Sequence, residues 1–264
     1  RRRTVHCHDE LVMFTSQLRL VVMQIEQTAK TVLIGGMTGG IGKALAQQLS
    51  AQGDTVVGFS RSGSHDAAAC DATDPQAVTD YCKQAASVHG RIDAYVHAIG
   101  SIYLKPAHLT PVEDWLDAIN QNLNSAFYAL RAMLPILQKQ GGGRLLFFSS
   151  VAAEVGLANH EAIAAAKGGL AALVRSAAAT YAPRGIRINA IAPSLTDTPL
   201  SGGITGNEQA LKISQQMHPL GAINTATDVA SLATWLLSDG AQQVTGQIFV
   251  MDGGLSSIVP KPKM

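Results

Sequence analysis

Short apolar runs alternate with longer segments of helical period from residue 30 onward. The runs are rich in Val, Ile and Leu, while the longer segments are rich in Ala and repeat their apolar positions every three or four residues. Strands that alternate with helices in this way form repeated βαβ units, in which the strands are parallel and the helices cover the sheet. The pattern predicts an α/β fold, a doubly wound parallel sheet of about seven strands with helices on both faces.

Glycine and proline positions set the bounds of these elements. One helix ends at Gly53, and another meets Pro183 and Gly185 as stop signals. Residues 195–219 have weak periodicity and contain Gly202-Gly203, so we expect a mobile segment there. The predicted strands are 31–34, 55–59, one ending at residue 71, 92–97, 144–148, 186–191 and 247–251, and the predicted helices are 41–52, 75–88, 112–138, 161–181 and 228–237.

No linker or shift in composition divides residues 30–264, which predicts a single domain around one large core. Residues 1–29 precede it as an N-terminal extension. Within the extension, residues 11–23 are apolar but too interrupted by polar side chains for a membrane span, and no signal-peptide cleavage site follows. The extension is either loosely attached chain or a result of where the reading frame begins, since Met23 lies just ahead of the first strand.

The charge balance and the cysteines limit which partners and which cellular compartment we expect for this protein. Twenty basic and nineteen acidic side chains give a formal charge of +1, which leaves no basic excess to bind nucleic acid or an anionic membrane. Cys7, Cys70 and Cys82 form no CxxC pair, so we expect free thiols in the cytoplasm. His6-Cys7-His8-Asp9 contains potential metal ligands, but adjacent residues cannot all turn toward one ion, and we expect no metal site.

A glycine-rich turn joins the first predicted strand to the first predicted helix. Positions without a side chain allow the backbone to approach phosphates, and the helix start directs free N–H groups and the positive end of its dipole at them. Because the turn follows a strand and opens a helix, it predicts a dinucleotide site rather than an ordinary flexible connection. The residues of this turn are Gly36, Thr38, Gly40, Ile41 and Gly42.

The glycine spacing and three polar residues further along resemble one enzyme family. Gly-x-x-x-Gly-x-Gly, followed in order by Asn122, Ser150 and Lys167, is similar to the short-chain dehydrogenase/reductase pattern over residues 30–256. The chain most resembles the branch of the 3-oxoacyl carrier protein reductases. The resemblance implies a Rossmann fold, a nicotinamide dinucleotide, and hydride transfer between this cofactor and the carbonyl or alcohol group of a small molecule.

Ser60 and Arg61 follow the second strand, where an acidic residue would accept both ribose hydroxyls of NAD. A carboxylate would repel a 2′-phosphate and a guanidinium would bind one, so NADP(H) is favoured over NAD(H). The alternative is that Arg61 is a solvated loop residue. The resemblance implies further cofactor contacts at Asp71, Ala72, His97, Gly100, Pro193 and Thr198, and it implies that Lys167 holds the nicotinamide ribose.

The family's Asn-Asn-Ala-Gly sequence after the fourth strand is replaced here by His97-Ala98-Ile99-Gly100. The resemblance implies that Gly100 keeps the backbone close to the cofactor. Because the asparagine is missing, either His97 supplies one of the family's strand-stabilising hydrogen bonds or these bonds are not made. The alternative for His97 is that it is only a packed core residue.

In the family, four side chains deliver the proton that accompanies hydride transfer. The resemblance implies that Asn122 kinks the long helix and holds a water, that Ser150 bonds the substrate oxygen, and that Lys167 lowers the pKa of the acid. The acid itself is a tyrosine four residues before the lysine, and here that position is Ile163. An aliphatic side chain cannot donate a proton, so either another group supplies it or the activity is lost.

His160 is the titratable group that could replace the tyrosine. It lies three residues before Ile163 and seven before Lys167, so on a continuous helix the three would share one face. The enoyl-reductase branch of the same superfamily has its tyrosine at this position, and histidine is a competent acid near neutral pH. The alternative is that His160 caps the start of the helix.

Two functions remain open on the sequence. The first is an NADP-dependent reductase of a ketone or aldehyde, or of an acyl thioester or activated C=C bond, with His160 or a bound water as the proton source. The second is a non-catalytic dinucleotide-binding subunit or sensor. Members of the family pair their two long helices across subunits, so we expect a homodimer or homotetramer.

Overall fold

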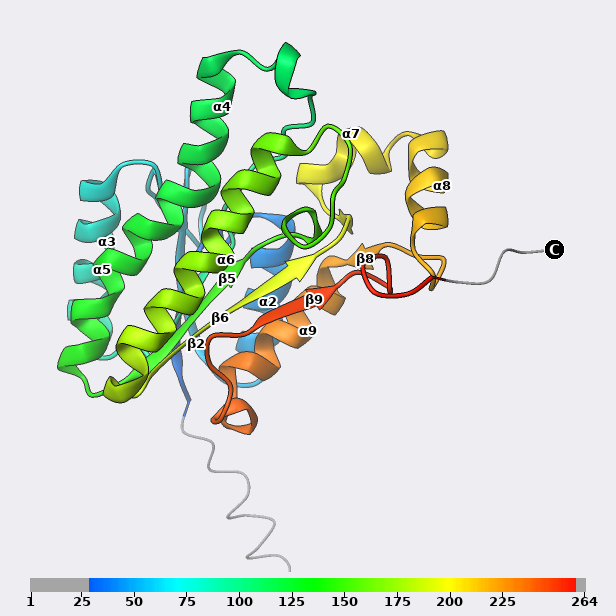
Figure 1. The fold of residues 1–264 in the computed structure, drawn as a ribbon. Coiled ribbons are helices and arrows are strands. Elements are labelled where there is room, and N and C mark those ends of the chain that lie inside the picture. The colour runs from blue at the N-terminus through cyan, green and yellow to red at the C-terminus, as the bar shows by residue number, and fades with distance from the viewer. Residues whose placement is uncertain (1–28, 260–264) are drawn as a thin grey trace, which may run out of the picture.

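The computed structural model describes residues 29–259, and a seven-stranded sheet runs through them (Figure 1). The strand order is β3-β2-β1-β4-β5-β6-β9, and every neighbouring pair is parallel, which confirms the predicted doubly wound sheet. The strands are β1 (Thr31–Gly35), β2 (Thr55–Ser60), β3 (Ala68–Ala69), β4 (Ala94–His97), β5 (Gly143–Phe148), β6 (Ile186–Pro193) and β9 (Ile248–Met251).

Helices cover both faces of the sheet, and each face has its own apolar core (Figure 1). In β1, Leu33 packs into one core while Val32 and Ile34 pack into the other, because successive strand side chains point to opposite faces. The helices on one face are α2 (Gly40–Ala51) and α9 (Ala226–Leu237), and those on the other are α3 (Pro75–His89), α5 (Ser125–Lys139) and α6 (Glu161–Tyr181).

The chain leaves the centre of the sheet in two directions. From β1 it passes outward to β2 and β3, and it then returns to β4 on the opposite side of β1. Ligands of doubly wound sheets bind in the crevice at such a reversal, beyond the carboxyl ends of the strands. This places the glycine turn after β1 and Gly100 after β4 at one crevice.

The long helix predicted at residues 112–138 is interrupted in the structure. It consists of α4 (Val112–Ile119), a π-helical segment η2 (Asn120–Asn124) and then α5. A π-helical turn inside an α-helix is frequent at functional sites. Asn122 lies in this segment and is buried.

Residues 195–219, where a mobile segment and no helix or strand were predicted, contain regular secondary structure. The chain there forms β7 (Thr196–Asp197), which pairs with β8 (Asn224–Thr225), and then the helices α7 (Gly202–Thr205) and α8 (Glu208–Met217). The two helices lie beyond the tips of the β6 and β9 arrows in Figure 1. α7 has only four residues and α8 has no buried residue, so neither has the long apolar stripe by which a core helix is predicted.

By length and composition alone, the stretch Glu161–Arg184 could cross a membrane. It contains α6, which packs along β6 and against α4, and half of the stretch is buried inside the fold. Core helices of soluble proteins pass the same test.

The N-terminal extension, with His6-Cys7-His8-Asp9, lies outside the described residues except for Ala29. Within residues 29–259, Cys70 and Cys82 are buried free thiols. No group of three or more potential metal ligands occurs in that part of the chain.

Candidate active site

The glycine turn between β1 and α2 is closed by backbone contacts that exclude side chains. Gly36 has a φ of +81°, and a Cβ there would lie 2.5 Å from the Ala98 carbonyl oxygen. A Cβ on Gly42 would lie 2.2 Å from the Gly36 carbonyl oxygen. The cap residue Gly39 has no side chain to bond the first N–H groups of α2, which leaves them for a ligand.

The same turn meets the chain that follows β6. A Cβ on Gly40 would lie 2.6 Å from Thr198 Cγ2, so the two segments are in close contact. Thr38 is exposed on the turn, and Ile41 is half-buried and lines the cavity described below. The predicted phosphate and nicotinamide contacts therefore lie side by side.

The end of β2 presents a buried hydroxyl followed by an exposed guanidinium. Ser60 is buried, and its Oγ has no hydrogen-bond partner within the described residues. Arg61 Nη2 donates to Gln121 Oε1 at 3.4 Å. This is a long bond at an exposed position, from which the guanidinium is easily displaced.

Asp71 and Ala72 follow β3, at the same edge of the sheet. Asp71 accepts hydrogen bonds from Thr73 N at 2.9 Å and from Thr73 Oγ1 at 2.8 Å. These bonds lower the pKa of the Asp71 carboxyl, and the charge of Arg61 lowers it further. Ala72 is buried.

His97 ends β4 and is enclosed in the core, where it does not line the cavity. Its Nε2 lies 3.0 Å from Ser125 Oγ, and its Nδ1 lies 2.9 Å from the Tyr95 hydroxyl. Ser125 donates to the Gln121 carbonyl at 2.7 Å, so it accepts from Nε2–H while Tyr95 donates to Nδ1. Burial, with a smaller effect of the Lys167 charge, lowers the pKa of His97 to about 3. A neutral histidine thus bonds β4 to the start of α5.

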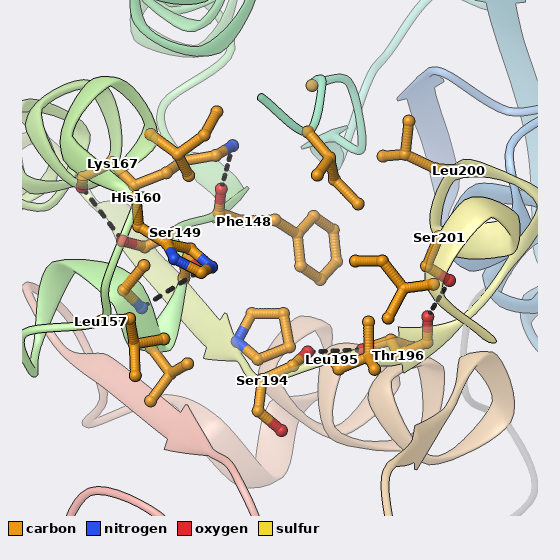
Figure 2. Close-up of a pocket in the computed structure, with 18 of the residues that line it drawn as sticks. Phe148, Ser149, Leu157, His160, Lys167, Ser194, Leu195, Thr196, Leu200 and Ser201 are labelled. Atoms are coloured by element: carbon orange, nitrogen blue, oxygen red, sulfur yellow. Dashed lines mark hydrogen bonds between the residues drawn. The ribbon is translucent and has the colours of Figure 1, made fainter. Parts of the chain in front are cut away.

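A cavity of about 560 Å³ opens at the crevice, with a mostly apolar wall (Figure 2). Three predicted residues, Gly100, Asn122 and Lys167, meet at this cavity. A Cβ on Gly100 would lie 2.8 Å from Asn122 Oδ1 and 3.3 Å from Lys167 Nζ. The residues that the sequence singled out and that line the cavity are Ile41, Gly100, Asn122, Ser150, His160, Ile163, Lys167, Pro193 and Thr198.

Lys167 is buried in α6 with its ammonium at the cavity. Nζ donates to the Phe148 carbonyl oxygen at 2.8 Å, and Ser149 Oγ donates to the Lys167 carbonyl at 3.0 Å (Figure 2). Burial lowers the pKa of Lys167 to about 8. The side chain is therefore held by the end of β5 and loses its charge closer to neutral pH than a solvated lysine does.

Asn122 is held by three hydrogen bonds. Its Oδ1 accepts from Ser101 N at 3.0 Å, and its Nδ2 donates to Ser101 Oγ and to the Ala118 carbonyl, both at 2.9 Å. These bonds join the π-helical segment η2 to the loop after Gly100. The asparagine thereby fixes one wall of the cavity.

Ser150 stands at the end of β5, where it caps the short helix η3 (Val151–Ala153). Its Oγ accepts from Ala152 N at 3.2 Å. The serine is half-buried and lines the cavity. A hydroxyl that accepts from the backbone keeps its own proton to donate to a ligand oxygen.

His160 lies just before α6 rather than inside it, so the three residues do not share one continuous helix. Asn159, with a φ of +65°, turns the chain into α6, and His160 makes no side-chain capping bond. Instead its Nδ1 lies 2.7 Å from the Ala158 carbonyl oxygen. A carbonyl only accepts, so Nδ1 carries a proton and Nε2 is left for the cavity. Ile163, one turn into the helix, is buried and also lines the cavity.

Ser194 and His218 are among the polar residues of the cavity wall that were not predicted as site residues. Ser194 follows the predicted Pro193, and His218 lies in the segment where no element was predicted. The structure brings His218 Nε2 to 2.7 Å from Ser194 Oγ. A histidine directly before Pro219, at the end of a weakly amphipathic stretch, was the one signal in the sequence.

Comparisons with known proteins identify the family of this chain. Residues 36–256 match the model of a family described as enoyl-(acyl carrier protein) reductase. The chain is 33% identical to the cis-4-hydroxycyclohexanecarboxylate dehydrogenase of Sinomonas cyclohexanicum, over 87% of this chain and 97% of that protein. It is 29% identical to the 3-oxoacyl-[acyl-carrier-protein] reductase FabG of Escherichia coli, over 86% and 97%.

A solved structure shares the fold. The structure of ElxO with NADP bound has a TM-score of 0.82 and 26% identity, and the match covers 88% of this chain and all of that one. The chain belongs to the short-chain dehydrogenase/reductase family of oxidoreductases. The resemblance drawn from the glycine spacing, Asn122, Ser150 and Lys167 is thereby confirmed at the level of the family.

Proposed function

We propose that this protein is an NADP(H)-dependent oxidoreductase that reduces the carbonyl of a ketone or aldehyde, or oxidises the corresponding alcohol. The observation that carries the proposal is the convergence of Ser150, His160 and Lys167 on one cavity beside the glycine turn. Relatives named as a hydroxycyclohexanecarboxylate dehydrogenase and a 3-oxoacyl reductase support a hydroxyl or keto substrate.

The residues at the crevice fit a nicotinamide dinucleotide. Gly36 and Gly42 leave room for a pyrophosphate at the start of α2. The unpaired buried hydroxyl of Ser60, next to the guanidinium of Arg61, suits a ribose 2′-phosphate and favours NADP(H) over NAD(H). The NADP held by ElxO supports the same choice. When bound, the cofactor supplies or accepts the hydride at the carbonyl carbon.

Ile163 occupies the position of the family's tyrosine acid, and we assign the role of that tyrosine to His160. Because the Ala158 carbonyl holds Nδ1–H, proton transfer takes place at Nε2: in reduction the doubly protonated ring gives its Nε2 proton to the substrate oxygen and becomes neutral, and in oxidation the neutral ring takes that proton back. Ser150 donates its hydroxyl proton to the same oxygen and polarises the carbonyl. The ammonium of Lys167 adds positive charge beside the developing alkoxide and, with Phe148, keeps a fixed position.

A non-catalytic dinucleotide-binding protein is the second proposal. It is favoured by one observation, that the buried side chain at position 163 is aliphatic. In that case the glycine turn and Lys167 would bind the cofactor without turnover. The two proposals predict different effects on activity when a tyrosine is placed at position 163.

The deciding experiment is NADPH oxidation with ketones, aldehydes, diketones and acyl thioesters. If His160 is the acid, His160→Ala loses activity by about 10²-fold or more, while Ile163→Tyr gains little. His89→Ala is the matched control, because His89 is exposed at the end of α3. Unchanged turnover in His160→Ala would refute the assigned acid. NADPH binding without turnover, together with activity created by Ile163→Tyr, would establish the non-catalytic protein.

We further propose a cytoplasmic homodimer or homotetramer that pairs the long helices of two subunits. Exposed apolar side chains on these helices support this, since large apolar patches on soluble proteins mark interfaces. Among the residues that the structure describes, Val112, Leu116 and Phe127 are exposed on α4 and α5. The molar mass in solution, measured by light scattering, tests the assembly.

A further inference from the structure

Ser194 and His218 form a buried hydrogen-bonded pair in the wall of the cavity. Ser194 follows β6, His218 follows α8, and both side chains line the cavity although they are nearly inaccessible to solvent. His218 Nδ1 lies 2.6 Å from the Ser214 carbonyl oxygen. Asn224 Nδ2 donates to Ser194 Oγ at 3.2 Å and to the Met251 carbonyl at 2.7 Å.

The hydrogen-bonding capacity of this pair is not filled. The Ser214 carbonyl only accepts, so His218 Nδ1 carries a proton. When the ring is neutral, Ser194 donates to Nε2 and accepts from Asn224, which leaves one lone pair on Ser194 Oγ. When the ring is protonated, Nε2–H donates to Ser194 as well, and the serine hydroxyl proton must find another acceptor. In either state Ser194 has one hydrogen bond to offer a ligand.

A glycine at position 194 would offer no such bond. A serine hydroxyl that already donates one hydrogen bond and accepts one can still accept another from a ligand. Leu195, Met217 and Leu255 of the cavity wall are apolar, and the Thr196 hydroxyl, which also lines the cavity, donates to the Ser194 carbonyl at 3.0 Å. Ser194 Oγ therefore differs from these neighbours in having a hydrogen bond to offer.

We propose that Ser194, held by His218, binds a second, uncharged oxygen of the substrate, apart from the carbonyl that is reduced. This inference rests on the proposed function and names its substrate class, an apolar ketone that carries a further hydroxyl or carbonyl group. Figure 2 shows the Ser194 hydroxyl pointing away from Lys167 and Phe148. The serine accepts from a hydroxyl or donates to a carbonyl, according to the protonation state of His218.

A carboxylate fits this place less well than a neutral oxygen. Although burial raises it, the pKa of the nearby Asp252 carboxyl is lowered overall by hydrogen bonds from Ser256 and Gly254 and by the charge of His218. Asp252 is thus an anion beside the histidine, and it would repel a second carboxylate.

The experiment measures recognition separately from turnover. Ring ketones hold two oxygens at fixed separations, so the probes are matched pairs: cyclohexanone with 4-hydroxycyclohexanone and 1,4-cyclohexanedione, and 2-decalone with its hydroxylated and diketone forms. Their binding to the complex of the enzyme with NADP⁺ is measured by calorimetry, and kcat/KM is measured beside it. The variants are Ser194→Ala, Ser194→Thr, which keeps a hydroxyl, and Met217→Leu, which changes the shape of the wall without changing its hydrogen bonds.

The wild type should bind the dioxygenated member of at least one pair about tenfold more tightly than the plain ketone. Ser194→Ala should reduce this preference to within about twofold. Ser194→Thr should keep it, and Met217→Leu should change both members of a pair alike. Thermal unfolding and NADPH binding show whether each variant is folded.

Three results would overturn the proposal. In the first, Ser194→Ala weakens the binding of both members of a pair equally. In the second, the wild type shows no preference within any pair. In the third, the wild type binds 4-oxocyclohexanecarboxylate most tightly of all the probes. Preferential binding without turnover of any ketone would leave this site standing while refuting the proposed reductase.

Discussion

The two walls of the site are built in different ways. The wall of the proposed cofactor site consists of strand ends and a helix start beside the cavity, where Gly36 and Gly42 bring backbone against backbone. The wall of the proposed substrate site consists of side chains that line the cavity, including Ser150, His160 and His218. The first has the glycine spacing of the family, whereas the second has an aliphatic side chain at Ile163 and a serine at position 194. A backbone cradle tolerates little change, but a wall of side chains can change its chemistry one residue at a time.

The largest effect should come from adding one methyl group to the cofactor wall. In Gly36→Ala, a residue with a φ of +81° would place its Cβ 2.5 Å from the Ala98 carbonyl oxygen. We expect a loss of about 2–4 kcal/mol in the free energy of unfolding, and NADPH binding weakened beyond detection. Chemical denaturation and NADPH fluorescence measure both quantities.

Gly168→Ala is the control, because a Cβ there meets open space on α6. It should stabilise the protein by up to about 1 kcal/mol. If Gly36→Ala behaved like this control, the cradle would not depend on backbone contact, and the contrast between the walls would fail.

Lys167 belongs to both walls, and its replacement should cost activity more than stability. We expect Lys167→Met to lose about 10²-fold or more of kcat/KM. The pH dependence follows from its lowered pKa of about 8, against 10.5 for the ordinary side chain. Between these values the unfolded chain binds a proton at this side chain that the folded chain does not, so Lys167 contributes stability that grows as the pH rises, by about 3 kcal/mol at most.

Relative to the wild type, Lys167→Met should lose this contribution, as measured by denaturation of both proteins between pH 8 and 10.5. Lys139→Met, at the exposed end of α5, should follow the wild type. The same pH dependence in Lys167→Met as in the wild type would mean that Lys167 does not make this contribution.

His97 lies in the core next to the cofactor wall, and its effect on the free energy of unfolding should appear at acidic pH. Its pKa of about 3 lies below the ordinary value of 6.5. In this range the unfolded chain binds more protons, so stability is present above pH 6.5 and is lost as the pH falls toward 3, by as much as about 5 kcal/mol. His97→Asn should flatten that loss, and His89→Asn should not. Thermal unfolding from pH 7 to 4 tests this.

Arg61 should give the smallest effect. Its guanidinium is exposed and holds Gln121 only at 3.4 Å, so it is free to bind a 2′-phosphate in solvent. Arg61→Ser should raise the Kd for NADPH about tenfold and leave that for NADH within about twofold. Arg175→Ser, exposed on α6, should change neither. Equal weakening of NADPH and NADH binding would show that Arg61 does not distinguish the 2′-phosphate.

Much of the fold could be predicted, because each strand and helix of the sheet has its own pattern. The range predicted for α6 coincides with the helix, and β1, β2 and β5 differ from their predicted ranges by one residue at an end. The π-helical segment at Asn122 and the helices α7 and α8 were not predicted. A π turn depends on a local shift of the backbone hydrogen bonds, and α7 and α8 lack the long buried stripe of a core helix.

The sequence by itself determined the family, the glycine cradle and the absence of a phenol at position 163, since spacing and residue type decide each of them. Only the tertiary structure decided which groups meet. It brought His218 to Ser194, buried Lys167 against Phe148, and enclosed His97 between Tyr95 and Ser125. Hydrogen bonds between residues far apart in the chain, and the solvent that burial removes from them, depend on how α6, α8 and the strand ends pack, and no local pattern encodes that packing.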